Sequence, residues 1–143
     1  MIVVLGRPGL TADGRLARAA GRIAQAAATA GSRVELVGSV GDDAAGEAVA
    51  LALGVAGVGH AALLRDPAGV TPSVDSDGIE TGAPLARLDA SDIDLGLRYV
   101  PECRVLVVAD PLDERALGIA IEAATYHGAA LIVLVAPGAA GEA

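Results

Sequence analysis

Short runs of β-branched residues alternate with longer alanine-rich runs along almost the whole chain, and this alternation limits the folds open to it. Strand-length runs that are apolar throughout are typical of parallel strands buried on both faces, and the longer runs between them have helical spacing. The pattern predicts a three-layer α/β/α domain with a mostly parallel sheet of about five strands. The expected strands cover residues 2–5, 34–40, 60–64, 105–109 and 131–135.

The first expected helix runs from about Gly14 to Ala30, with Asp13 placed to cap its free amides and Gly31 placed to end it. At about 100° per residue, one face of this helix is apolar and carries Leu16, Ala20, Ile23 and Ala27. Well away from that face lie three arginines, Arg15, Arg18 and Arg22. The spacing therefore predicts that the arginines point into solvent.

Three further helical starts follow from capping and proline signals. Asp42 or Asp43 caps a second helix that extends to about Leu53, and residues 89–92 open a short third helix. Asp110-Pro111 begins a fourth, with proline in the first turn, where its missing N–H costs nothing. Residues 66–89 are rich in Pro, Gly, Ser, Thr and acids, and they form a long loop or a small flap within the single domain, residues 1–143, that this length predicts.

The charge and composition exclude several classes of function. The chain has 18 acidic residues against ten basic ones, all of them arginine, and its formal net charge of −8 opposes binding to a nucleic-acid backbone. The absence of lysine excludes a lysine phosphate grip and a Schiff base. No segment reaches the roughly 18 apolar residues of a membrane span. Cys103 is the single cysteine, and its apolar surroundings predict a buried thiol. We therefore expect a cytoplasmic protein that binds neither nucleic acid nor membrane.

Candidate chemical groups are few, and structural uses account for most of them. Asp42 and Asp43 could bind a cation or a hydroxyl-rich ligand, but one of them is expected to cap a helix. His60 and His127 lie at element ends, where capping or a surface position is the expected role. The turn 75–78 has oxygen ligands without the full calcium-loop pattern. We predict no catalytic residue, no metal and no cofactor.

The run from residue 17 to residue 46 resembles the N-terminal half of the ribokinase-like (PfkB-type) carbohydrate kinases. The features in common are an alanine-rich helix ending at Gly31, a strand that runs into a Gly-Asp-Asp-x-x-Gly turn at 41–46, and a Gly-Val strand entry at 54–55. The resemblance implies a ribokinase-like half domain. It also implies a sugar site near the start of the first helix.

Departures from the family's pattern fall on the residues that would bind sugar. Ala17 and Arg18 stand where the family has its di-glycine, and Arg22 stands where it has its sugar-binding Asn. The segment between the first strand and the first helix is too short for the family's first lid strands, so we expect the flap near 70–79 to be their only remnant. The nucleotide-binding half and its catalytic base are expected to be missing, and residues 138–142 echo the anion-hole turn only superficially.

Two functions follow as expectations from this resemblance. The first is a degenerate, truncated sugar-kinase homologue without kinase activity, which acts as a homodimer or beside a second subunit. The alternative is a sugar- or nucleoside-binding protein, or a carbohydrate kinase that a partner completes. The candidate ligand-binding residues are Arg18, Arg22, Asp42 and Asp43. In the homodimer, the apolar strands and the flap at 66–89 are the expected contact surfaces.

Overall fold

A computed structural model describes residues 1–135 and contains a central sheet of five parallel strands. The order across the sheet is β5-β4-β1-β8-β9, so the first strand lies in the middle with its neighbours added on both sides. The sequence prediction of a mostly parallel five-stranded sheet is confirmed. The strands are β1 (Ile2–Gly6), β4 (Val34–Gly41), β5 (Leu63–Asp66), β8 (Val105–Val108) and β9 (Ala130–Val133).

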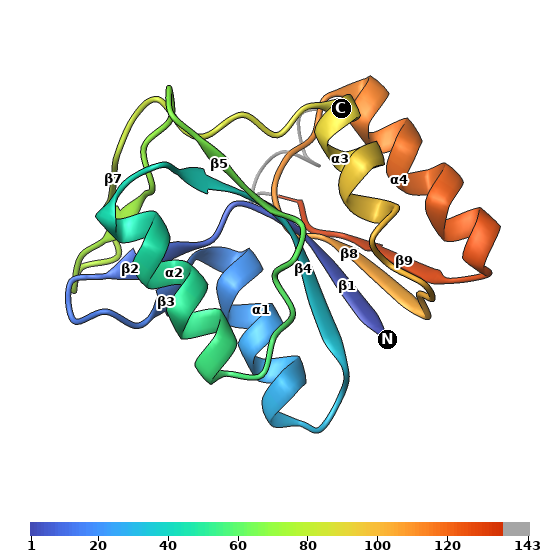
Figure 1. Cartoon of the computed structure of the whole chain (residues 1–143), viewed down its shortest axis with the longest axis horizontal. Helices are drawn as coiled ribbons and strands as arrows, with labels where there is room; N and C mark the ends of the chain where they lie inside the picture. Colours follow the sequence, from blue (N-terminus) through green and yellow to red (C-terminus); the bar gives the residue numbers. More distant parts are fainter. Residues whose placement is uncertain (136–143) are drawn as a thin grey trace.

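Two pairs of helices cover the two faces of this sheet (Figure 1). The helices α1 (Arg18–Thr29) and α2 (Ala44–Val55) pack on one face, mainly over β1 and β4. The helices α3 (Ala90–Leu97) and α4 (Glu114–His127) pack on the other face, over β4, β8 and β9. Each face has its own buried apolar cluster, so the expected three-layer α/β/α arrangement is also confirmed.

Small residues let the layers approach closely, in place of the aromatic side chains that this core does not have. Ala20 and Ala24 of α1 and Ala116, Ala120 and Ala124 of α4 are buried against the sheet. Gly38 is the tightest position, because a Cβ there would lie 1.8 Å from the carbonyl oxygen of Gly6 on the neighbouring strand. The centre of the sheet therefore depends on glycine at residue 38.

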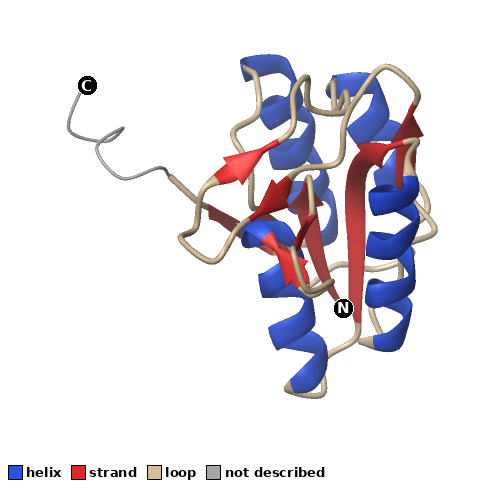
Figure 2. Cartoon of the chain, turned by 90° about the vertical axis from the view of Figure 1, so that its left-hand side faces the viewer, coloured by secondary structure: helices blue, strands red, loops and turns tan. Residues whose placement is uncertain are grey.

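A second, four-stranded sheet forms a lid beside the main one, and Figure 2 views the molecule from the lid side, with the short strands in front. Its order is β3-β2-β6-β7. The pairs β2–β3 and β6–β7 are antiparallel hairpins, joined through the parallel pair β2–β6. The four strands are β2 (Gly9–Thr11), β3 (Leu16–Ala17), β6 (Ser73–Val74) and β7 (Glu80–Thr81).

The lid corrects two predictions about the first helix. Residues 14–17 are not helical: the Thr11 amide donates to the Arg15 carbonyl, which closes a hairpin, and α1 begins only at Arg18. Asp13 accepts a hydrogen bond from the Thr11 hydroxyl instead of capping a helix. The expectation that no room remains for the first lid strands was therefore wrong, because two- and three-residue strands suffice. The predicted flap at 66–89 does contain strands, namely β6 and β7.

Other boundaries shift by a few residues. The third strand of the main sheet begins at Leu63 rather than at His60, because residues 60–63 make a turn in which the Leu63 amide donates to the His60 carbonyl. The fourth helix begins at Glu114 and is capped by Asp113, so Asp110-Pro111 does not open it. The buried position of Cys103 is as predicted, and burial raises the pKa of its thiol.

Strand β9 lies at an edge of the sheet and is poorly covered. Within residues 1–135, α1 and α2 pack mainly over β1 and β4, and in Figure 1 they lie at the lower left, away from β9 at the right. The side chains of Ile132 and Val133 are 48% and 41% exposed, and Val135 just beyond the strand is 61% exposed.

No helix within the described part of the chain is long and apolar enough to cross a membrane.

Exchange of Gly38 for alanine tests the close approach at the centre of the sheet. We expect Gly38→Ala to lower the free energy of unfolding by more than about 3 kcal/mol, because its Cβ meets backbone that cannot move aside. The matched control is Gly118→Ala in α4, where a Cβ meets nothing within 4 Å. It should raise stability by about 0.5–1 kcal/mol through helix propensity. Urea unfolding followed by circular dichroism measures both, and equal midpoints would contradict the close approach.

Candidate functional site

The carboxyl ends of β1 and β8 meet near Asp110, which lies two residues beyond the end of β8 and has a side chain only 7% exposed. Asp110 accepts a hydrogen bond from the backbone amide of Arg7 at the end of β1. A Cβ on Gly6 would lie 2.7 Å from Asp110 Oδ2 and 2.8 Å from Ala20 Cβ, so glycine is required for the carboxylate to sit there. This is the edge at which open α/β sheets hold their ligands.

Arg18 completes a buried ionic cluster with Asp110. Its Nη2 is hydrogen-bonded to Asp110 Oδ1, and its Nη1 lies 3.0 Å from Glu80 Oε1 on lid strand β7. The Arg18 side chain is only 14% exposed. The prediction that it points into solvent was therefore wrong. Arg18 is the first residue of α1. Its side chain extends toward the carboxyl ends of the strands and not outward from the helix.

The backbone of Arg18 is in an unusual conformation. Its φ of 66° lies in the left-handed region, which glycine adopts freely and a side-chain-bearing residue adopts at a cost of about 1–2 kcal/mol. No other non-glycine residue in the described chain has a positive φ. The residue is held there by the ion pairs of its side chain and by the β3–α1 junction on which it stands.

A cavity of about 700 Å³ lies between α1 and the lid, and three arginines line it. Arg18 forms part of its wall, Arg22 reaches it from the next turn of α1, and Arg15 reaches it from the lid hairpin. Polar groups from Thr11, Gln25 and Thr29 complete much of the wall. The structure thus brings two predicted ligand-binding residues, Arg18 and Arg22, to one cavity.

Asp43 serves the framework. Its Oδ1 accepts hydrogen bonds from the Gly46 amide at 2.7 Å and from the Thr71 hydroxyl at 2.7 Å, and its Oδ2 accepts one from the Thr71 amide at 3.0 Å. The Thr71 hydroxyl in turn accepts from the Gly41 amide at 2.9 Å. Asp43 therefore caps α2, as the sequence suggests for one of the two aspartates, and also fixes the segment that leads into β6.

The pKa of Asp43 reflects these contacts. Partial burial by itself would raise the pKa, but the hydrogen bonds from Thr71 and Gly46 together outweigh it and hold the pKa below its ordinary value. Because the pKa is lower in the folded chain than in the unfolded one, the ionised carboxylate stabilises the fold at neutral pH. That contribution is lost as the pH falls through the folded pKa.

Asp42 differs from its neighbour, since it is exposed and its amide, not its side chain, makes the contact with Asp66. Neither aspartate is among the residues that line the arginine cavity. The structure therefore separates the four candidate residues into a pair at the cavity and a pair at the α2 turn.

The sequence reasoning missed the partners of Arg18. Asp110 carried a usable signal, because it follows a buried strand next to the first one, where ligand-binding side chains gather in parallel sheets. Glu80 and Thr71 carried no such signal, since each reaches its partner through the path of the lid loop. Arg15 was identified, but as a solvent-facing residue of a helix.

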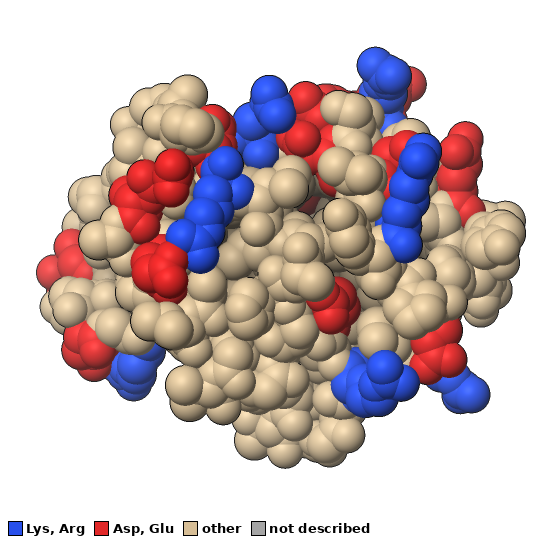
Figure 3. All heavy atoms as spheres, viewed as in Figure 1, with Lys and Arg blue, Asp and Glu red and all other residues tan. Residues whose placement is uncertain are grey.

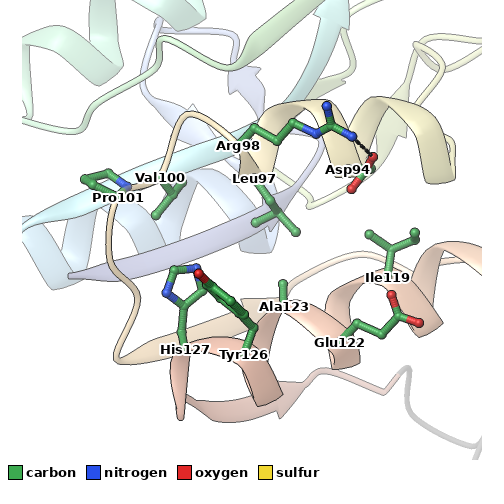
Figure 4. Close-up of a pocket in the computed structure, with 10 residues that line it drawn as sticks. All are labelled: Asp94, Leu97, Arg98, Val100, Pro101, Ile119, Glu122, Ala123, Tyr126 and His127. Atoms are coloured by element: carbon green, nitrogen blue, oxygen red, sulfur yellow. Dashed lines mark hydrogen bonds and ion pairs between the residues drawn. The ribbon is translucent and has the colours of Figure 1, made fainter.

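A second cavity, of about 590 Å³, lies between α3 and α4 (Figure 4). Tyr126 and His127 stand at one end of it with their rings 5.1 Å apart, and Arg98 is paired with Asp94 at 3.0 Å across its upper wall. Tyr126 is 87% exposed. Arg98 and Asp94 in this groove already pair with each other, and the Tyr126 side chain faces solvent. The groove therefore offers no set of convergent polar groups for a ligand.

The remaining candidates have structural roles or lie elsewhere. The turn 75–78 is closed by the Asp75 carboxylate, which accepts from the Asp77 and Ile79 amides, as expected of a solvated turn. His60 Nδ1 lies 3.2 Å from the Val58 carbonyl oxygen. Within residues 1–135, no three His, Cys, Asp or Glu side chains are grouped to hold a metal ion. The echo at 138–142 lies outside the described residues.

The two aspartates of the turn provide a matched test of these roles. Asp43→Ala should lower the free energy of unfolding at pH 7 by about 2 kcal/mol, because the cap is lost and the Thr71 groups lose their acceptor. Asp42→Ala should leave the unfolding midpoint nearly unchanged. The difference between the two variants should shrink as the pH falls below the ordinary aspartate pKa and then through the lower pKa of folded Asp43. A difference that is constant between pH 7 and pH 3 would contradict this assignment.

No protein-family model matches the sequence, and no curated protein matches it. Solved structures do match in fold. A putative ribokinase II from E. coli with ATP and Mg²⁺ has a TM-score of 0.75 at 14% identity, with 92% of this chain and 51% of that chain covered. A PfkB protein from Polaromonas sp. JS666 has a TM-score of 0.73 at 15% identity, with 95% and 56% covered.

A fructokinase from Xylella fastidiosa with bound ATP has a TM-score of 0.71 at 15% identity, with 95% of this chain and 49% of that chain covered. The expected resemblance is thereby confirmed at the level of structure. This chain has the fold of the ribokinase-like, PfkB-type sugar kinases and spans about half the length of the solved structures that it matches.

Proposed function

We propose that this chain is a degenerate ribokinase-like domain without sugar-kinase activity of its own, which acts through self-association or with a partner protein. The observation that carries the proposal is the position of Arg18. By its resemblance to the kinases, this residue stands where a glycine lies against the sugar. Here its guanidinium is fixed between Asp110 and Glu80.

The backbone of Arg18 supports this alignment. It keeps the left-handed conformation that a glycine would adopt, although the residue now bears a long charged side chain. A neutral sugar that enters at this point would have to separate a largely buried ion pair. Loss of one partner of such a pair typically costs about 3–5 kcal/mol, which is more than a few hydroxyl contacts return.

The first test is an assay of ATP-dependent phosphorylation of ribose, fructose and adenosine by the purified chain. We expect no turnover above background. The control is Arg22→Gln, an exposed substitution purified in the same way, since a contaminating kinase would give equal rates in both preparations. Turnover that is proportional to the protein and changes with Arg22→Gln would contradict the proposal.

Strand β9 is the surface that we propose for self-association. Residues 130–135 contain no charge, no proline and no glycine, and most of them are exposed at the sheet edge. Such an edge leaves backbone donors and acceptors available for another strand. The opposite edge, β5, carries Arg65 paired with Glu47 and is followed by Pro67, which are features that discourage pairing. A two-fold pairing of β9 strands would cover both the open edge and Ile132.

Light scattering at micromolar concentration tests the association. We expect twice the chain mass of 14.0 kDa for the wild type and a single chain mass for Ile132→Lys, because the new charge would be buried at the contact. Val55→Lys is the matched control. Val55 is 91% exposed at the end of α2, and its exchange should leave the mass doubled. A wild-type mass of one chain that does not change on concentration would refute the proposed dimer.

The arginine cavity favours an alternative function, a small-molecule binding protein or a kinase completed by a second subunit. Its volume of about 700 Å³ is adequate for a sugar-sized molecule. ATP-dependent turnover that appears only on addition of a second polypeptide would identify the completed kinase.

The proposed setting is the cytoplasm, without nucleic acid as a partner. The single buried Cys103 suits a reducing compartment. Figure 3 shows acidic and basic side chains interspersed over the visible face, with no basic stripe of the kind that tracks a phosphate backbone.

A further inference from the structure

We propose that the cavity between α1 and the lid binds a small anionic molecule, one that carries a phosphate or carboxylate group beside hydroxyls. This inference extends the small-molecule alternative above. It does not depend on whether the chain dimerises or lacks kinase activity.

The charges around the cavity support an anionic ligand. Three of its ten lining residues are arginines, and no carboxylate stands among those ten, in a chain whose net charge is −8. Arg22 makes no ion pair with any residue of the described chain. A guanidinium that faces a cavity without a carboxylate partner is suited to bind phosphate or carboxylate in two-pronged geometry.

The other two arginines have partners that a ligand could replace. Arg15 is paired with Asp13 on the surface, with both side chains more than 60% exposed, and such pairs contribute little. Arg18 Nη1 lies 3.0 Å from Glu80 Oε1, yet it forms no hydrogen bond there and is shielded from solvent. Glu80 therefore holds the place of an anion at Arg18 without satisfying its donor.

The Glu80 carboxylate is also placed so that it can move away from Arg18. It belongs to β7, a strand of only two residues at the edge of the lid, and its side chain is 43% exposed. An incoming anion can take over the Arg18 contact while the Asp110 pair on the other nitrogen stays intact. Thr11, Gln25 and Thr29 then supply side-chain donors and acceptors for the neutral part of the ligand, for which hydroxyl groups are the matching chemistry.

Calorimetric titration without ATP tests the proposal, with ribose 5-phosphate, ribose and inorganic phosphate as probes. We expect ribose 5-phosphate to bind at least about tenfold more tightly than ribose, since charge-assisted hydrogen bonds are the stronger kind. It should also bind more tightly than inorganic phosphate, which lacks the hydroxyls. Equal affinity for ribose and its phosphate would overturn the anionic part of the proposal, and phosphate alone binding as well as the ester would overturn the hydroxyl part.

Three variants locate the binding. Arg22→Gln should weaken ribose 5-phosphate by about tenfold, and Glu80→Gln should strengthen it severalfold, because a competing carboxylate is removed. Arg33→Gln is the control, since Arg33 lies beyond the far end of α1 and pairs loosely with Glu102 at 3.7 Å. Unchanged affinity in Arg22→Gln, or an equal loss in Arg33→Gln, would refute the site. The masses and kinase rates of the same samples report separately on the proposed function.

Discussion

The buried pair of Arg18 with Asp110 joins the parts of this molecule. Asp110 lies just beyond β8 and accepts a hydrogen bond from the amide that follows β1, while Arg18 begins α1 and reaches the lid through Glu80. Two strands, a helix and the lid therefore meet through three side chains, Arg18, Asp110 and Glu80. Gly6 has to be glycine because the carboxylate occupies the space of its missing side chain. Removal of either partner would leave a charge in a largely enclosed place, which explains how an unfavourable backbone conformation at Arg18 is retained.

The sequence was sufficient for the main sheet and its layers, because alternating apolar and alanine-rich runs have few arrangements that bury both. It was also sufficient for the cap of α2 at Asp43. It failed at the lid, where strands of two or three residues are too short to show a period. It also failed for Arg18, whose direction is set by a left-handed backbone and by partners 62 and 92 residues away in the chain rather than by helical spacing. The contacts of Glu80 and Thr71 arise from the tertiary path of a loop, which no local pattern records.

The turn that supports the resemblance and the two arginines that depart from it differ in what the fold requires of them. In the Gly41–Gly46 turn, a Cβ on Gly46 would lie 2.2 Å from the Gly41 carbonyl oxygen, and Asp43 satisfies both the helix cap and Thr71. That turn is needed by the scaffold with or without a ligand. Arg22 is exposed and makes no such framework contact, and Arg18 is paired with Asp110 through one nitrogen while its Nη1 has no hydrogen-bond partner. Within about thirty residues after the first strand, the residues that the fold requires are therefore different from the residues that could bind a ligand.

The chain has only two aromatic residues of the Phe, Trp and Tyr class, and this limits how its conformational changes can be observed. There is no tryptophan, and the two tyrosines, Tyr99 and Tyr126, are 62% and 87% exposed in the folded state. Their surroundings would change little when the chain unfolds or when a ligand enters a cavity on the far side of the sheet. Intrinsic fluorescence and near-ultraviolet absorption will be almost silent for this protein. A tryptophan introduced at the lid would report on changes there by its fluorescence, because the rest of the chain contributes almost no fluorescence of its own.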